Sequence, residues 1–82
     1  MYLEVITPDK KVFEGEATGV KVPGTDGTFE MLENHADIIS TLGQGDVTIH
    51  TKKGETMTVK IDSGTLEMLN NKAVILAESI LD

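Results

Sequence analysis

Apolar and polar residues alternate with a period of two along much of this chain. In residues 46–51, Val47 and Ile49 alternate with polar neighbours, and residues 55–61 repeat the pattern. Successive side chains of a β-strand point to opposite faces, so this period places one face on a core and the other in water. No segment has a convincing helical period. The pattern therefore predicts a chain of amphipathic strands.

Turn-forming residues divide the chain into segments of strand length. Gly, Pro, Asn and Asp recur between apolar runs, and Asn70-Asn71 is typical of a tight hairpin. The longest strand is expected to bend at Gly15 or Gly19, and residues 77–82 are the best candidate for a single helical turn. The predicted strands cover residues 2–7, 12–22, 28–32, 38–42, 46–51, 55–61, 64–69 and 72–78.

Residue types agree with this all-β interpretation. Thr, Val and Ile supply 24 of the 82 residues, and β-branched side chains favour strands over helices. The length suits one domain, so we expect residues 1–82 to form a single β-sandwich or flattened barrel with an aliphatic core.

Charge limits the classes of partner. Seven lysines and no arginine stand against 14 acidic residues, for a formal net charge of −7. No basic surface is available for phosphates, so binding to nucleic acid or to an anionic membrane surface is not expected. The longest apolar stretch, residues 73–77, is far shorter than the roughly 20 residues of a spanning helix. Direct insertion into lipid is therefore not expected either.

The residue pattern predicts no catalytic, metal or cofactor site. His35 lies in the segment Glu33-Asn34-His35-Ala36-Asp37, and an extended backbone would place both carboxylates on its side. Ser40 is the nearest nucleophile, but no strained nucleophile elbow surrounds it. We therefore interpret His35 as a loop or interface residue, with a small hydrolase built on His35 and Ser40 as an alternative.

A carrier domain is a second alternative. Biotinyl and lipoyl domains are all-β, of similar length, and display a lysine on a hairpin tip. Lys53 is expected on such a tip, but its neighbours are Lys52 and Gly54 rather than the methionines typical of those domains. Another small binding module with this fold also stays open at this point.

Several stretches of the chain resemble one known family. The most specific is the segment from Asn34 to Asp37 with its apolar flanks and the Ser-Thr-Leu that follows. The chain is similar to the N-terminal β domain of the epsilon subunit of the F-type ATP synthase. The matching stretches are residues 3–9 with 12–16, 20–29, 31–42, and 63–68 with 71–77.

The resemblance implies a fold and a role. Its domain is a flattened β-sandwich of about ten short strands, without a catalytic site or cofactor of its own. It sits at the foot of the central stalk, held by the gamma subunit and resting on the c-ring. There it turns with the rotor and couples ion flow to ATP synthesis. The resemblance implies a peripheral position on the cytoplasmic side of the energy-transducing membrane.

The resemblance also nominates contact residues. The turn at residues 24–28 and the loop at residues 34–37 are expected to face the c-ring. The gamma subunit is expected to meet apolar side chains that turn outward, because two consecutive isoleucines cannot both enter one core. The c-ring candidates are Asp26, Thr28, Glu33, Asn34, His35 and Asp37, and the gamma candidates are Ile38, Ile39 and Leu42.

Two departures from the family pattern matter. Asp37 stands where the family usually has proline, which removes a fixed φ and adds a charge that we expect to contact the c-ring. Many family members continue into a pair of C-terminal helices that restrains ATP hydrolysis. The last residues, 79–82, resemble neither a tag nor a linker, so we expect a naturally short chain without that helical domain and without helix-based self-inhibition.

Overall fold

The computed structural model describes residues 1–81, which fold as one continuous nine-stranded sheet without a helix. The all-β prediction is confirmed, and no predicted strand boundary is wrong by more than two residues. The strands are β1 (Tyr2–Ile6), β2 (Lys11–Gly24), β3 (Gly27–Leu32), β4 (Ile38–Leu42), β5 (Gly45–Thr51), β6 (Thr56–Ile61), β7 (Gly64–Leu69), β8 (Lys72–Ala77) and β9 (Ile80–Leu81).

The expected helical turn at residues 77–82 is wrong. Ile80 and Leu81 instead form β9, which pairs antiparallel with Ile61 and Lys60 of β6. Ile80 also packs against the core. Backbone pairing to a strand edge and burial of an apolar side chain both favour this arrangement, whereas a single helical turn is costly to nucleate. Asp82 lies outside the described residues.

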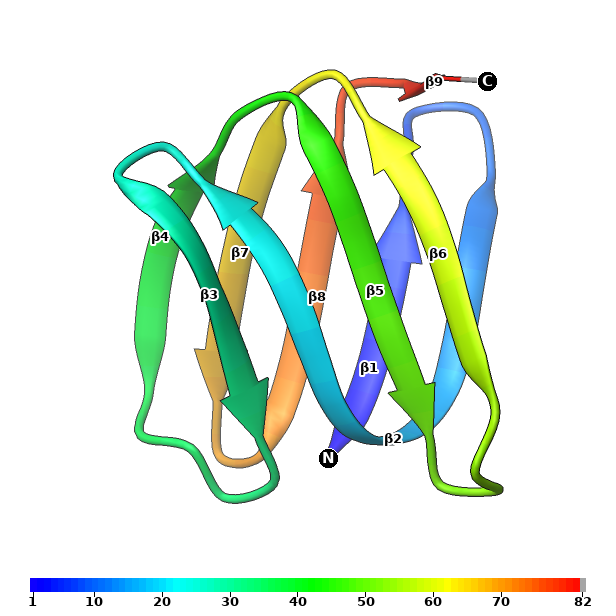
Figure 1. Ribbon diagram of the computed structural model, residues 1–82, viewed down its shortest axis with the longest axis vertical. Helices are drawn as coiled ribbons and strands as arrows, with labels where there is room; N and C mark the ends of the chain where they lie inside the picture. The colour runs from blue at the N-terminus through cyan, green and yellow to red at the C-terminus, as the bar shows by residue number, and fades with distance from the viewer. Residues whose placement is uncertain (82) are drawn as a thin grey trace.

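The sheet folds over into two layers. In Figure 1, β3, β2, β5 and β6 lie in front, and β4, β7, β8 and β1 lie behind. The strand β2 belongs to both layers, because residues 11–16 pair with β1 while residues 17–21 pair with β5 and residues 19–24 with β3. The register of β2 against β5 shifts between Ala17 and Gly19. The bend, predicted at Gly15 or Gly19, therefore lies between Ala17 and Gly19.

The core between the layers is aliphatic, as predicted. Each of the strands β1 to β8 contributes at least one buried apolar side chain to the core. No buried polar side chain occurs among residues 1–81. The largest fully buried side chains are those of Met1, Leu3, Met31, Ile49, Ile61, Leu66, Met68 and Ile75.

The N-terminus is fixed in this core. The Met1 side chain is buried, and its ammonium group donates to the Ala17 carbonyl at 2.8 Å and to Glu33 Oε1 at 2.9 Å. The hydrogen bond and the positive charge of this ammonium group hold the pKa of Glu33 below its usual value of 4.5. Met1 thus ties the loop after β3 to the bend of β2.

We expect Gly64→Ala to destabilise the fold. Gly64 pairs with Ala77, and a Cβ at Gly64 would lie 2.3 Å from the Leu76 carbonyl oxygen. Relief requires the β7 and β8 backbones to move apart, at a cost of about 1–3 kcal/mol. Urea unfolding measures this loss, and Gly43→Ala is the matched control because a Cβ at Gly43 meets nothing closer than 4.0 Å. Equal stabilities of the two variants would contradict the prediction.

We expect Glu33→Gln to be less stable than the parent chain at pH 7. The lowered pKa means that ionised Glu33 stabilises the fold above its unfolded pKa, and this contribution is lost as the pH falls through the folded pKa. The difference between the two chains should therefore vanish in acid.

Urea unfolding of both chains at several pH values from 7 to about 3 measures how their difference in stability changes with pH. Glu55→Gln is the control, since Glu55 is exposed and no lysine, histidine or N-terminal nitrogen among residues 1–81 lies within 4.0 Å of its carboxylate. A stability difference that persists in acid would count against the ionic role of Glu33.

Candidate protein interface

The residues predicted to face the c-ring lie at opposite ends of β3. Asp26 precedes the strand and Thr28 is near its start, whereas the loop at residues 33–37 follows its end (Figure 1). Six strand residues span about 20 Å. A partner that touches both groups must therefore extend along the whole of β3.

β3 is suited to such a contact because it is an edge strand. Among residues 1–81 it pairs only with β2. Thr28, Glu30 and Leu32 share one face of the strand and are exposed, Leu32 by 59%. We call these three residues, together with Asp26 and residues 33–37, the β3 strip.

The loop of the β3 strip is held by the turn between β7 and β8. Asn34 has a φ of 63°, and its N–H donates to Asn71 Oδ1 at 2.8 Å. Asp37 Oδ1 accepts from the Asn70 N–H at 3.0 Å. Asn70 and Asn71 themselves have positive φ values of 50° and 61°, which confirms the predicted hairpin chemistry. Asp37 therefore fixes the loop through a side-chain hydrogen bond.

Residues 33–37 do not meet the condition under which both carboxylates would flank His35. The left-handed Asn34 turns the chain, so the carboxylates of Glu33 and Asp37 bind Met1 and Asn70 instead of flanking His35. His35 is exposed, and its Nδ1 lies 2.7 Å from the Ala36 carbonyl oxygen. This arrangement leaves the ring at the surface of the β3 strip.

No acid–base pair is assembled around Ser40 within the described chain. The Ser40 hydroxyl donates to the Thr41 carbonyl at 3.2 Å. The hydrogen bonds of His35 join it to Leu32 and Ala36, not to Ser40. Nor do any three acidic or histidine side chains of residues 1–81 gather where they could hold a metal ion.

At the other end of the β3 strip, a tight turn presents Asp26. The Thr25 N–H donates to the Thr41 carbonyl at 3.1 Å, and the two threonine hydroxyls lie 2.8 Å apart. A Cβ at Gly24 would lie 2.7 Å from the Gly27 carbonyl oxygen, so only glycine fits there without displacement. The turn is therefore fixed to β4, with the Asp26 side chain exposed.

The three residues predicted to meet gamma differ in exposure. Ile39 is 76% exposed and turns outward as expected, whereas Ile38 is partly buried and packs against the core, so its nomination as an outward side chain is wrong. Leu42 is only 3% exposed, and the expectation that it turns outward is wrong. Strict alternation from Ile39 places Leu42 on the inner face of β4.

Ile39 belongs to a larger apolar surface that the sequence analysis missed. The register of the back layer places it on the outer face together with exposed or partly exposed residues of β1, β7 and β8. A signal was present, since an uninterrupted apolar run at residues 73–77 must place apolar side chains on both faces of a strand. We call this surface the apolar face. Its apolar members are Ile6, Ile39, Leu69, Val74 and Leu76, and Glu4, Glu67 and Lys72 lie in the same cross-strand rows.

The front layer has a different outer face. Cross-strand partners there are polar, such as Lys21, Thr48 and Thr58 in one row. On the same face, Glu30 Oε2 lies 3.5 Å from His50 Nε2. The outer face of the front layer is therefore more polar than that of the back layer.

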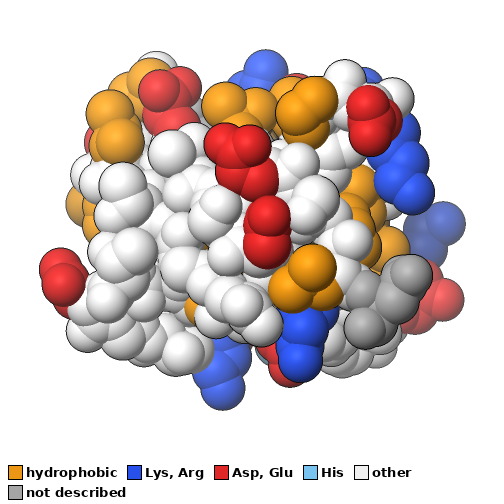
Figure 2. All heavy atoms as spheres, turned by 90° about the horizontal axis from the view of Figure 1, so that it is seen from above, with side chains coloured by type: hydrophobic (Ala, Val, Ile, Leu, Met, Phe, Trp, Pro, Cys, Tyr) orange, Lys and Arg blue, Asp and Glu red, His pale blue; other side chains and the backbone are white. Residues whose placement is uncertain are grey.

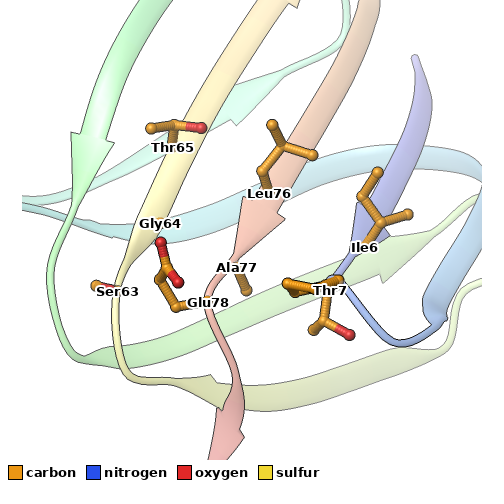
Figure 3. A pocket seen from close by; sticks show the side chains of 9 residues that line it. Ile6, Thr7, Ser63, Gly64, Thr65, Leu76, Ala77 and Glu78 are labelled. Atoms are coloured by element: carbon orange, nitrogen blue, oxygen red, sulfur yellow. The ribbon is translucent and has the colours of Figure 1, made fainter.

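The end of the molecule that carries the turn between β1 and β2 is mixed in character. Seen from this end, apolar and acidic side chains lie together near the middle of the surface, and lysines lie toward its rim (Figure 2). A pocket of about 500 Å³ opens here between the ends of β1, β7 and β8 (Figure 3). The described residues contain no helix with the length and apolar character needed to cross a bilayer.

Comparison with known proteins places this fold in one family. The model of the family "ATP synthase, Delta/Epsilon chain, beta-sandwich domain" matches residues 1–82. An ATP synthase epsilon chain of Chlorobium limicola is 35% identical over 78 residues, covering 95% of this chain and 89% of the relative. The epsilon chain of Salinibacter ruber is 33% identical over 86 residues, covering 95% of this chain and 58% of the relative. The chain thus spans little more than half of some relatives and most of another.

Solved structures share the fold. A chain of the Euglena gracilis mitochondrial ATP synthase superimposes with a TM-score of 0.88 at 15% identity, over 96% of this chain and 51% of its own length. A chain of the Tetrahymena thermophila mitochondrial ATP synthase, from a structure of the central stalk and c-ring, gives 0.83 at 15% identity, over 99% of this chain and 65% of its own. The strand pattern, the topology and the match along the whole chain lead to one conclusion: this chain belongs to the family of ATP synthase delta/epsilon chain β-sandwich domains.

Proposed function

We propose that this chain is a non-catalytic subunit in the rotor of an F-type ATP synthase, where it couples ion flow through the c-ring to ATP synthesis through gamma. The observation that carries the proposal is the family match over residues 1–82. The two structural neighbours come from ATP synthase structures that include the c-ring, which supports the same role. The carrier-domain alternative is not favoured, because the family match concerns a different class of β domain.

We assign the β3 strip to the c-ring. The strip carries exposed carboxylates at Asp26 and Glu30 and an imidazole at His35, on an edge strand held at both ends. Exposed charges of this kind set orientation and partner choice more than affinity. Glu33 and Asp37 serve the contact indirectly, since their carboxylates bind Met1 and Asn70 and so fix the loop.

We assign the apolar face to gamma. Stable subunit interfaces need an apolar centre, and Ile39, Leu69 and Leu76 are exposed by 76%, 48% and 49%. The face is built on the four strands of the back layer, which gives it a rigid backbone. The strand β3 lies in the other layer, and the loop at residues 33–37 meets the back layer at the turn between β7 and β8. In this role the chain is a peripheral component on the cytoplasmic side of the membrane.

We expect Ile39→Glu to weaken binding to a gamma-containing central-stalk complex by about tenfold or more, because a charge replaces the most exposed apolar contact of the face. Thr58→Glu adds the same charge to the polar face of β6 and should bind like the parent chain. Isothermal titration calorimetry measures both affinities. Equal binding by the two variants would exclude the apolar face as the gamma contact, and no binding by the parent chain would refute the proposed function.

We expect Asp26→Asn to weaken binding to isolated c-ring by up to about fivefold and to reduce its salt dependence, as loss of one exposed charge pair does. Asp46→Asn removes an acidic side chain from the outer face of β5 and is the control. Affinities measured by surface plasmon resonance at several salt concentrations test the assignment. A salt dependence unchanged by Asp26→Asn, or changed equally by both variants, would contradict it.

A further inference from the structure

The pocket of about 500 Å³ at the end of the back layer is formed by three neighbouring strands. In Figure 3, Ile6 and Thr7 of the β1 side and Ser63 and Thr65 of the β7 side stand on either side of β8. Leu76, Ala77 and Glu78 lie between them. The pocket therefore opens on the outer face of the sheet, where β8 ends.

One wall of the pocket is apolar and continuous with the apolar face. Ile6, Leu76 and Thr65 form one cross-strand row, and Pro8 extends it beyond β1. Leu76 is 49% exposed although its neighbours on both sides are strands. An elongated apolar group can thus lie across the ends of these strands.

The other wall offers unpaired acceptors. Among residues 1–81, no lysine, histidine or N-terminal nitrogen lies within 4.0 Å of the Glu78 carboxylate. The hydroxyls of Ser63 and Thr65 make no side-chain hydrogen bond within the described chain. The backbone here is fixed, since the Glu78 N–H donates to the Ser63 carbonyl at 3.0 Å. A few fixed polar groups beside an apolar wall are typical of a recognition site.

The adjacent turn is also fixed. Asp62 Oδ1 accepts from the Ser79 N–H at 3.0 Å, and the Asp62 N–H donates to the Ser79 carbonyl at 3.3 Å. The two bonds connect the turn between β6 and β7 to the segment that follows β8. The backbone at this end of the pocket therefore does not have to become ordered when a ligand binds.

We propose that this pocket binds an arginine side chain of a partner protein, with its aliphatic stem on Ile6 and Leu76 and its guanidinium group at Glu78. Arginine fits both walls, because its apolar stem ends in a planar fork of donors that matches a carboxylate and nearby hydroxyl oxygens. A phosphate or carboxylate ligand would be repelled by Glu78 and meets no cation in the lining. The chain has no arginine of its own, so the side chain comes from another protein.

The partner that we infer is the rotor subunit on the apolar face, and this identity rests on the proposed function. Leu76 belongs both to the pocket and to the apolar face, so a protein seated on that face passes over the pocket. The arginine would then be fixed at the border of the interface, where it sets the register of the partner.

The chemistry of the pocket can be tested without the partner. In a titration of the ¹⁵N-labelled chain with N-acetyl-arginine amide, we expect shifts of the Ser63, Gly64, Thr65 and Glu78 amides. Glu78→Gln should reduce the affinity about threefold or more, while the control Glu55→Gln should leave it unchanged. N-acetyl-norleucine amide, which lacks the cation, should bind more weakly. Shifts elsewhere, no shifts, or shifts insensitive to Glu78→Gln would overturn the inference.

Binding to the gamma-containing complex tests the partner. Glu78→Gln should weaken it by about tenfold, with Glu55→Gln unchanged. If the parent chain binds and Glu78→Gln binds equally well, the inference fails and the proposed function stands. If the parent chain does not bind, the proposed function fails, and the titration with the arginine probe alone decides whether the pocket has the proposed chemistry.

Discussion

The whole fold depends on β2, because this one strand supplies backbone hydrogen bonds to both layers. Its first half pairs with β1 and its second half with β3 and β5. A strand of 14 residues can do this only if it bends, and the register shift between Ala17 and Gly19 provides the bend. The ammonium group of Met1 binds the Ala17 carbonyl at this point, and through Glu33 it fixes the loop of the β3 strip. The same few residues therefore hold the bend that closes the sheet and the loop of the proposed interface.

The strands and their inner faces could be predicted from the sequence because they follow from local pattern. The alternation around Val47 and Ile49 places both in the core, where the structure has them. The alternation of strand side chains also explains why the outward orientation expected for Leu42 was wrong. Ile39 faces outward, so a residue three positions later in the same strand must face inward. The helical turn expected at the end failed for a different reason: the edge of β6, which pairs with Ile80 and Leu81, is distant in sequence.

The candidate site was less predictable because it depends on contacts between distant segments. His35 and Asp26 are close in sequence, and only the strand β3 between them shows that they lie at opposite ends of an edge. From the sequence alone, the Asp37 carboxylate was expected to contact a partner. Its hydrogen bond to the Asn70 N–H could not be predicted, because it depends on the β7–β8 turn lying beside the loop. The pocket likewise joins three segments, at residues 6–8, 63–65 and 76–78.

The purely aliphatic core has a mechanical consequence for the proposed role. Within residues 1–81 the two layers meet through side chains without a buried polar group, so their contact is non-directional and resists sliding only by close packing. If partners pull on opposite layers, the load becomes shear between the layers. The backbone of β2, which runs through both layers as a single strand, lies in the path of that force. Its register shift between Ala17 and Gly19 is the point on this path where the ladder of backbone hydrogen bonds is interrupted.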